Sequence, residues 1–176
     1  MSVNAIPDTG RCLTVEPLTA AAFASFGEVI EASERASHYG INEGFAERYH
    51  DLARIDVGCD GGRAIVSIFR AQPRRLPFQL SLVERHRLSS QAFVPLAGQR
   101  FLVVVAAAGP APEPAALRCF MATGGQGLNM ARGIWHHPLL ALDAEGDFLV
   151  IDRAGPGAAT DCEEHSLLQA DWWIAG

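Results

Sequence analysis

The feature of this sequence that most constrains its fold is a series of short apolar or alternating runs, which begins at Ala64 and ends at Arg153. Each run has the length of a β-strand, and several are rich in Val, Ile and Phe. Gly, Pro or charged residues separate the runs, and no long stretch among them has the period of a helix. The pattern predicts an all-β chain, a sandwich or barrel, with only a few short helices. The runs are residues 64–70, 78–82, 91–95, 100–106, 117–121, 127–130, 139–142 and 148–153.

The N-terminal part of the chain predicts one short helix. Thr19 is a candidate N-cap, residues 20–26 favour a helix, and Gly27 stands where a glycine would end it. Residues 1–12 are predicted to be a disordered or extended N-terminal extension. The chain has 176 residues, a length that fits one domain, so residues 13–176 are expected to form a single domain.

Composition excludes several classes of protein. The net charge of −6 argues against a nucleic-acid partner, which would need a basic surface. No apolar run approaches the ~20 residues of a membrane span, and the N-terminus lacks the pattern of a signal peptide. The 4 cysteines are far apart and form no C-x-x-C pair, which argues against a disulfide framework or a zinc knot. A reducing cytoplasm is the expected location.

The chain contains no lysine, and all 14 basic residues are arginine. Lysine Schiff-base chemistry and a lysine general base are therefore excluded. Any positive charge that holds an anionic ligand must come from an arginine, a metal ion or backbone N–H groups.

Two groups of residues contain histidines at positions suited to chemistry. Glu84 and His86 are two residues apart, so on a strand they point to the same face, and Gln91 would arrive from the next strand. In the second group a glycine turn at Gly133 precedes His136, which would stand at the entrance of a strand. A single histidine is more often structural, but two such segments between strands of a predicted barrel indicate a shared site.

The spacing of these groups resembles the two metal-binding motifs of the cupin barrel family. Glu replaces the first histidine of the first motif, and Gln replaces its glutamate. Carried over by position, the family's metal ligands fall on Glu84, His86, Gln91 and His136. The positions that carry the spacing are Glu84, His86, Gln91 and Gly98 for the first motif, and Gly125, Ala131, Gly133, His136 and Leu140 for the second.

A closer resemblance, from Val15 to Cys162, is to the ureidoglycolate lyase family, cupin enzymes of allantoin degradation. This resemblance implies a cupin-type β-barrel, a jelly-roll-like double-stranded β-helix, and a homodimer. It also implies cleavage of (S)-ureidoglycolate into glyoxylate and urea. Ni²⁺ or another divalent metal is implied, and no organic cofactor. The strings that carry it are residues 41–44, 47–53, 67–73, 82–86, 90–95, 124–129, 135–139 and 147–153.

The chemistry that this resemblance implies needs a group that holds a small carboxylate. An arginine is the natural choice, because its fork binds both oxygens. Arg70 is the first candidate, since it ends a predicted strand inside a matching string. Arg48 is the second candidate, and Arg132, beside the glycine turn, is the third. Arg70 could instead form only a salt bridge at the end of its strand.

Proton transfer and recognition of the ureido group need further residues. His86 and His136 are candidates for metal ligand or acid–base catalyst, because the pKa of histidine suits proton exchange at neutral pH. Glu84 and Gln91 would complete a metal site or orient the substrate, and Asn42 could pair with the ureido group. Two alternatives remain open: a hydrolase that releases ammonia and carbon dioxide from the same substrate, and a cupin that binds a small carboxylate without turnover.

Overall fold

The computed structural model describes residues 6–176, and it is built mainly of β-strands, as predicted. Residues 1–5 of the predicted extension lie outside the described residues. The strands are β1 (Arg11–Leu13), β2 (Val15–Pro17), β3 (Gly27–Ile30), β4 (His38–Ile41), β5 (Ala46–Tyr49), β6 (Arg63–Ala71), β7 (Phe78–Gln79), β8 (Leu82–His86), β9 (Gln91–Pro95), β10 (Phe101–Ala106), β11 (Arg118–Ala122), β12 (Gly127–Met130), β13 (Trp135–His136), β14 (Leu140–Ala141), β15 (Gly146–Ala154), β16 (Cys162–Ser166) and β17 (Trp172–Ile174). The helices are α1 (Ala20–Phe23) and α2 (Ala158–Asp161), with 3-10 turns η1 (Asn42–Gly44), η2 (Cys59–Gly61), η3 (Pro114–Ala116) and η4 (Leu168–Ala170).

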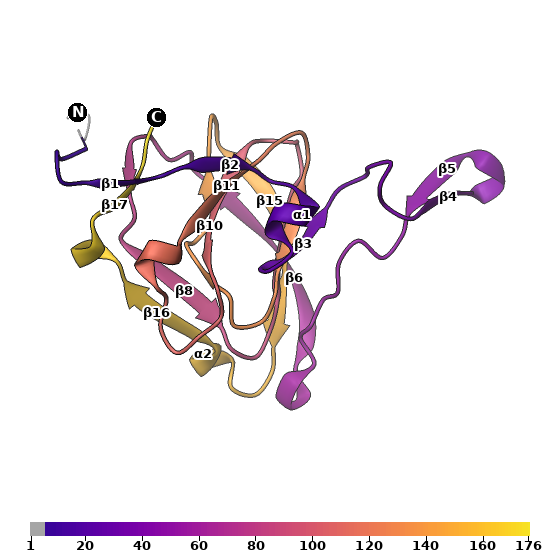
Figure 1. Ribbon diagram of the computed structural model, residues 1–176. Coiled ribbons are helices and arrows are strands. Elements are labelled where there is room, and N and C mark those ends of the chain that lie inside the picture. The colour runs from indigo at the N-terminus through magenta and orange to yellow at the C-terminus, as the bar shows by residue number, and fades with distance from the viewer. Residues whose placement is uncertain (1–5) are drawn as a thin grey trace.

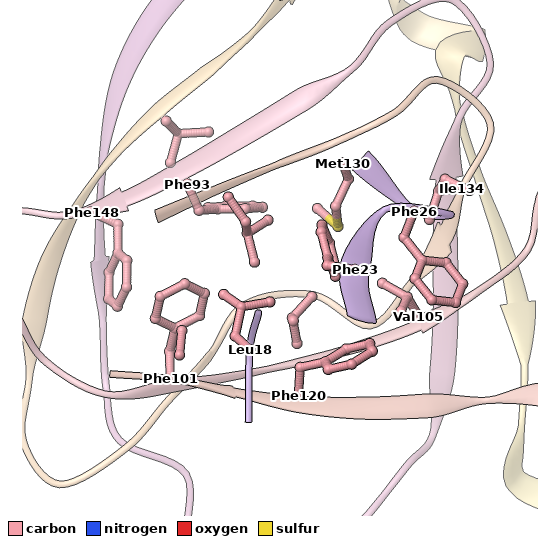
Figure 2. Packing of buried hydrophobic residues seen from close by; sticks show 14 of the residues in the cluster. Leu18, Phe23, Phe26, Phe93, Phe101, Val105, Phe120, Met130, Ile134 and Phe148 are labelled. Atoms are coloured by element: carbon pink, nitrogen blue, oxygen red, sulfur yellow. The ribbon is translucent and has the colours of Figure 1, made fainter. Parts of the chain in front are cut away.

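Two sheets enclose the core in a cupin-like β fold (Figure 1). One has the strand order β3-β12-β9-β15-β6, and the other runs β16-β8-β13-β10-β11-β2, with β14 added to β10. Aromatic side chains from both sheets meet between them (Figure 2). Phe93 and Phe148 come from the first sheet, and Phe101 and Phe120 from the second. The rings of Phe101 and Phe148 meet edge to face at 5.4 Å.

Strand β10 is buried along its whole length because both of its faces are covered. Phe101, Val103 and Val105 face the core between the sheets. Leu102 and Val104 face a second cluster on the other side of the strand. Residues of the three-stranded sheet β1-β17-β7 contribute to that second cluster. A continuous apolar run is what a strand buried on both faces requires.

The predicted helix is present but ends earlier than expected. The Thr19 side chain accepts a hydrogen bond from the Ala22 N–H at 3.2 Å, which confirms the N-cap. The helix ends at Phe23 rather than at Phe26. Gly27 begins β3 instead of capping the helix, and a Cβ there would lie 1.9 Å from the Asn129 carbonyl oxygen. Glycine is required at this position because β3 approaches β12 so closely.

The eight strand-like runs of the sequence all contain strands, and β9 and β12 have the predicted bounds. The run 78–82 is divided between β7 and the start of β8. Strands β1–β5, β13, β16 and β17 were not predicted. Arg11 and Cys12 of the predicted extension lie in β1, which pairs in parallel with β17. These strands are short. Apart from the local β4–β5 hairpin, they gain their hydrogen bonds from partners distant in sequence, which local patterns do not reveal.

The β4–β5 hairpin projects from the body of the molecule, at the right of Figure 1. Its two strands pair only with each other. We call residues 38–49 the arm. No helix among the described residues is long and apolar enough to cross a membrane.

Candidate metal centre

Three potential metal ligands from two paired strands converge in the structure. Glu84 and His86 lie on β8, and His136 lies on the neighbouring strand β13, directly opposite Glu84. One ligand atom from each residue can be chosen so that all three lie within 4.8 Å of one another. The structure therefore brings together three of the four residues on which the cupin ligands were expected to fall.

The imidazoles are oriented as metal ligands would be. Nδ1 of His136 lies 3.1 Å from the Ile134 carbonyl oxygen, which can only accept, so this nitrogen carries the hydrogen. Nε2 of His136 then has a free lone pair, and it lies 3.5 Å from Oε1 of Glu84. The rings of His86 and His136 are 5.5 Å apart. A backbone acceptor on the second ring nitrogen is typical of a metal-binding histidine.

The Nε2 atoms of His86 and His136 are both buried, and neither has a hydrogen-bond partner among the described residues. Buried ring nitrogens without a partner are uncommon in folded proteins, because they have lost their contact with water. A divalent cation beside these nitrogens and the Glu84 carboxylate would satisfy all three groups. The residues present therefore fit a divalent metal.

Electrostatics keeps Glu84 and His86 in the protonation states that bind metal. Burial opposes ionisation of Glu84, but the neighbouring His136 and His86 outweigh burial and lower the pKa of this carboxyl group. The pKa of His86 is lowered by burial and by the proximity of His136. Glu84 is then a carboxylate and His86 a neutral imidazole at neutral pH, as coordination requires.

Asp161, at the end of α2, fixes the chain that follows His86. Its carboxylate accepts hydrogen bonds from the Leu88 N–H at 2.6 Å and from the Ser89 hydroxyl at 3.2 Å. Its Oδ2 also lies 4.0 Å from Nδ1 of His86. Asp161 was not predicted from the sequence, since nothing in the local pattern of residues 154–162 singles it out.

Gln91 and Asp152 lie on the face of their strands that lines the space between the sheets. Gln91 shares its face of β9 with the core residue Phe93, and Asp152 shares its face of β15 with Phe148 and Val150. Asp152 was not predicted from the sequence, although a carboxylate that follows two inward apolar residues at a spacing of two was a usable signal. Burial raises the pKa of Asp152, and the proximity of His86, when protonated, opposes that shift.

Of the predicted carboxylate-binding arginines, Arg70 is not placed at the centre. It forms two hydrogen bonds to Asp147, of 2.8 and 3.0 Å, and its side chain is 66% exposed. Asp147 and Asp152 are five residues apart on β15 and therefore face opposite sides of the strand. The role of Arg70 in substrate binding stays a prediction.

Arg132 is the predicted arginine that the structure places beside the centre. The N–H of its neighbour Gly133 donates a hydrogen bond of 2.7 Å to the His86 carbonyl oxygen. The Arg132 side chain is 46% exposed, and its ion pair to Asp56 is long, at 3.9 Å. Its guanidinium is therefore available to a ligand.

Asn42 and Arg48 lie on the arm, away from the centre of their own chain (Figure 1). Asn42 is at the tip with a positive φ of 53°, and Arg48 pairs across the hairpin with Tyr39. Their predicted contact with the substrate would need the arm to meet a site in another chain.

The fold and the centre define a small cupin-like β protein with a His–His–Glu group that is compatible with a divalent metal. Comparison with known proteins identifies its family. The ureidoglycolate lyase family model matches residues 10–175, so the chain belongs to the ureidoglycolate lyase family. A ureidoglycolate lyase of Burkholderia cepacia is 57% identical over 156 residues, which cover 88% of this chain and 86% of the relative. One from Burkholderia mallei is 49% identical over 162 residues (92% and 93%), and one from Azotobacter vinelandii is 52% identical over 155 residues (88% and 92%).

A metal titration checks the centre. We expect the metal-stripped protein to bind one Ni²⁺ per chain, and His136→Ala to weaken binding by at least about tenfold, because it removes one ligand of the group. Isothermal titration calorimetry measures both. His165→Ala is the matched control, because His165 lies on β16 of the same sheet and packs against Trp135 instead. Equal Ni²⁺ affinity in wild type and His136→Ala would contradict the assignment.

Proposed function

We propose that this protein cleaves (S)-ureidoglycolate into glyoxylate and urea. The observation that carries the proposal is the Glu84, His86 and His136 group, in a chain that matches the lyase family over nearly its whole length. Relatives that bear the name ureidoglycolate lyase cover 88% or more of the chain, which supports the same substrate here.

The reaction breaks a carbon–nitrogen bond on a carbon that also carries a hydroxyl group. The hydroxyl must lose a proton as the carbonyl of glyoxylate forms, and the departing urea nitrogen must gain one. A bound metal would polarise oxygen and lower the pKa of the hydroxyl. Glu84, His86 and His136 would hold the metal, and Gln91, the fourth residue expected at the site, would orient the substrate. The metal is Ni²⁺ or another divalent ion, and no organic cofactor takes part.

The chain's own groups bind and orient the substrate around that centre. Glu84 is ionised beside the two imidazoles, so it can accept the proton that the hydroxyl loses. His136 is fixed by its hydrogen bond to Ile134, and His86 by the Asp161 loop. Neither ring must reorganise when the substrate arrives, which favours proton transfer at fixed distances.

Arg132 supplies the positive charge that the substrate carboxylate requires. It lies next to the backbone contact with His86, whereas Arg70 is already engaged by Asp147. Arg48 could bind the substrate carboxylate only if the arm reached the site of another chain. The structure thus favours Arg132 over the two arginines that the sequence placed first.

Removal of the Arg132 side chain should mainly weaken substrate capture. Loss of one partner of a charged hydrogen-bonded pair costs about 2–5 kcal/mol, which would appear chiefly as a higher KM in Arg132→Ala. Arg100→Ala is the control, since Arg100 is paired with Asp143 at the surface. If Arg70→Ala raises KM more than Arg132→Ala does, the arginine that binds the substrate carboxylate is Arg70 instead.

The activity itself is tested by product analysis with and without a chelator. Purified protein given (S)-ureidoglycolate should release equimolar urea and glyoxylate. Chelation should abolish turnover, and Ni²⁺ or another divalent ion should restore it. Release of ammonia and carbon dioxide in place of urea would assign a hydrolase.

We also infer a homodimer and a cytoplasmic location. Phe45 at the tip of the arm is 90% exposed, and Tyr39 is 44% exposed. On β6, Phe69 packs against Phe93, so Val66 and Ile68 on alternate positions face outward. Two exposed apolar patches on one chain suit a closed two-fold dimer, in which each arm covers the β6 face of the other copy. The cysteines are all free, which fits a reducing compartment.

A single charge at the arm tip tests the dimer. We expect wild type to have the mass of two chains by light scattering, and Phe45→Asp to have the mass of one. Leu168→Asp, at a residue 57% exposed on η4, should remain dimeric. A monomeric wild type, or a Phe45→Asp variant that dimerises as wild type does, would refute the role of the arm.

A further inference from the structure

Two oxygen acceptors that the metal centre does not use lie near it on adjacent strands. Strand β9 pairs with β15, and the register runs from Phe148 opposite Pro95 to Ile151 opposite Ala92. Continued by one residue, this register would place Asp152 opposite Gln91. Both side chains lie on the inward face of their strands. Gln91 is two residues from Phe93, and Asp152 is two and four residues from Val150 and Phe148, all of which lie in the core.

Each of these side chains has a buried oxygen without a hydrogen-bond donor. Oδ1 of Asp152 and Oε1 of Gln91 are both shielded from solvent, and no described residue donates to either. A buried acceptor without a donor is unfavourable, and native proteins hold few of them. Asp152 is not among the three residues whose ligand atoms converge within 4.8 Å, but it lies close enough to His86 for each group to affect the pKa of the other. The chain therefore holds paired acceptors at this place that no protein donor satisfies.

The chemistry of these acceptors selects a ligand that donates through nitrogen. A ureido group carries an internal N–H and a terminal NH₂, and these donors point from one edge of a planar group. A carboxylate accepts two such donors side by side, as it does from a guanidinium. The carboxylate end of the substrate offers no N–H, so these acceptors would bind the ureido end and not the carboxylate end.

We propose that Asp152, with Gln91, forms a ureido-binding subsite that determines the substrate specificity of this protein. The proposal rests on the proposed function for the identity of the substrate. Asp152 accepts hydrogen bonds from the ureido nitrogens, while Arg132 binds the carboxylate at the opposite end. A substrate held at both ends presents its central carbon to the metal centre in one orientation. A 2-hydroxy acid without a ureido group would leave the acceptors unpaired and bind poorly.

The test uses urea and glyoxylate as separate probes of the two ends. Ligand-observed NMR on the metal-loaded protein measures the binding of each probe without requiring turnover. In Asp152→Asn one acceptor oxygen becomes an NH₂ group that faces the donors of urea. We expect this variant to bind urea at least about tenfold more weakly, and glyoxylate and Ni²⁺ as wild type does. In turnover, KM for ureidoglycolate should rise about 10- to 100-fold.

Controls separate the subsite from the fold and from the proposed activity. Asp143→Asn, at an exposed aspartate bound to Arg100, should bind both probes as wild type does. Unchanged urea binding in a folded Asp152→Asn would overturn the subsite and leave the lyase activity standing. Loss of both probes together, or of Ni²⁺, would also overturn it, because Asp152 would then support the metal centre. Absence of turnover in wild type would reject the proposed function, while the binding of urea still decides the role of Asp152.

Discussion

The pairing of β8 with β13 is the interaction on which the rest of the site depends. This antiparallel contact sets His136 opposite Glu84, and the alternation along β8 then brings His86 to the same face. The hydrogen bond from His136 to Ile134 turns the free nitrogen of the ring toward Glu84. A shift of one residue in register would point these side chains to the opposite face of the sheet. The buried apolar core on both sides of β10 holds the register in place, because any slip would expose it.

Local patterns in the sequence were enough to predict the β class and to select Glu84, His86 and His136, which the structure brings together. The spacing of Glu84 and His86 encodes their shared face, and the glycine turn before His136 marks a strand entrance. The single domain of residues 13–176 stays a prediction. Asp152 was not predicted, although its spacing from Phe148 and Val150 was a usable local signal, and its nearness to Gln91 follows only from the pairing of β15 with β9. The ranking of the candidate carboxylate-binding arginines also depended on non-local contacts. Arg70 on β6 binds Asp147 on the neighbouring strand β15, and Arg132 is linked to His86 through the backbone of Gly133.

The charges and acceptors around the centre divide the site into functional parts. The imidazoles and Glu84 suit a metal and the hydroxyl, Arg132 suits the carboxylate, and the unpaired oxygens of Asp152 and Gln91 suit the ureido nitrogens. In the proposed reaction, each part would match one portion of ureidoglycolate. The positive charge would come from an arginine, because the chain has no lysine. The arm that carries Asn42 and Arg48 would add to this site only from a second copy of the chain.

The claim that a metal is held by Glu84, His86 and His136 is tested most directly by X-ray absorption spectroscopy of the Ni²⁺-loaded protein. The structure predicts a first coordination shell of nitrogen and oxygen at ~2.0–2.2 Å, with the outer-shell scattering of two imidazoles. Cys162 is the alternative ligand, because its Sγ lies 3.7 Å from Oε2 of Glu84. A sulfur atom in the first coordination shell would therefore contradict the account. A spectrum without imidazole scattering would contradict it as well.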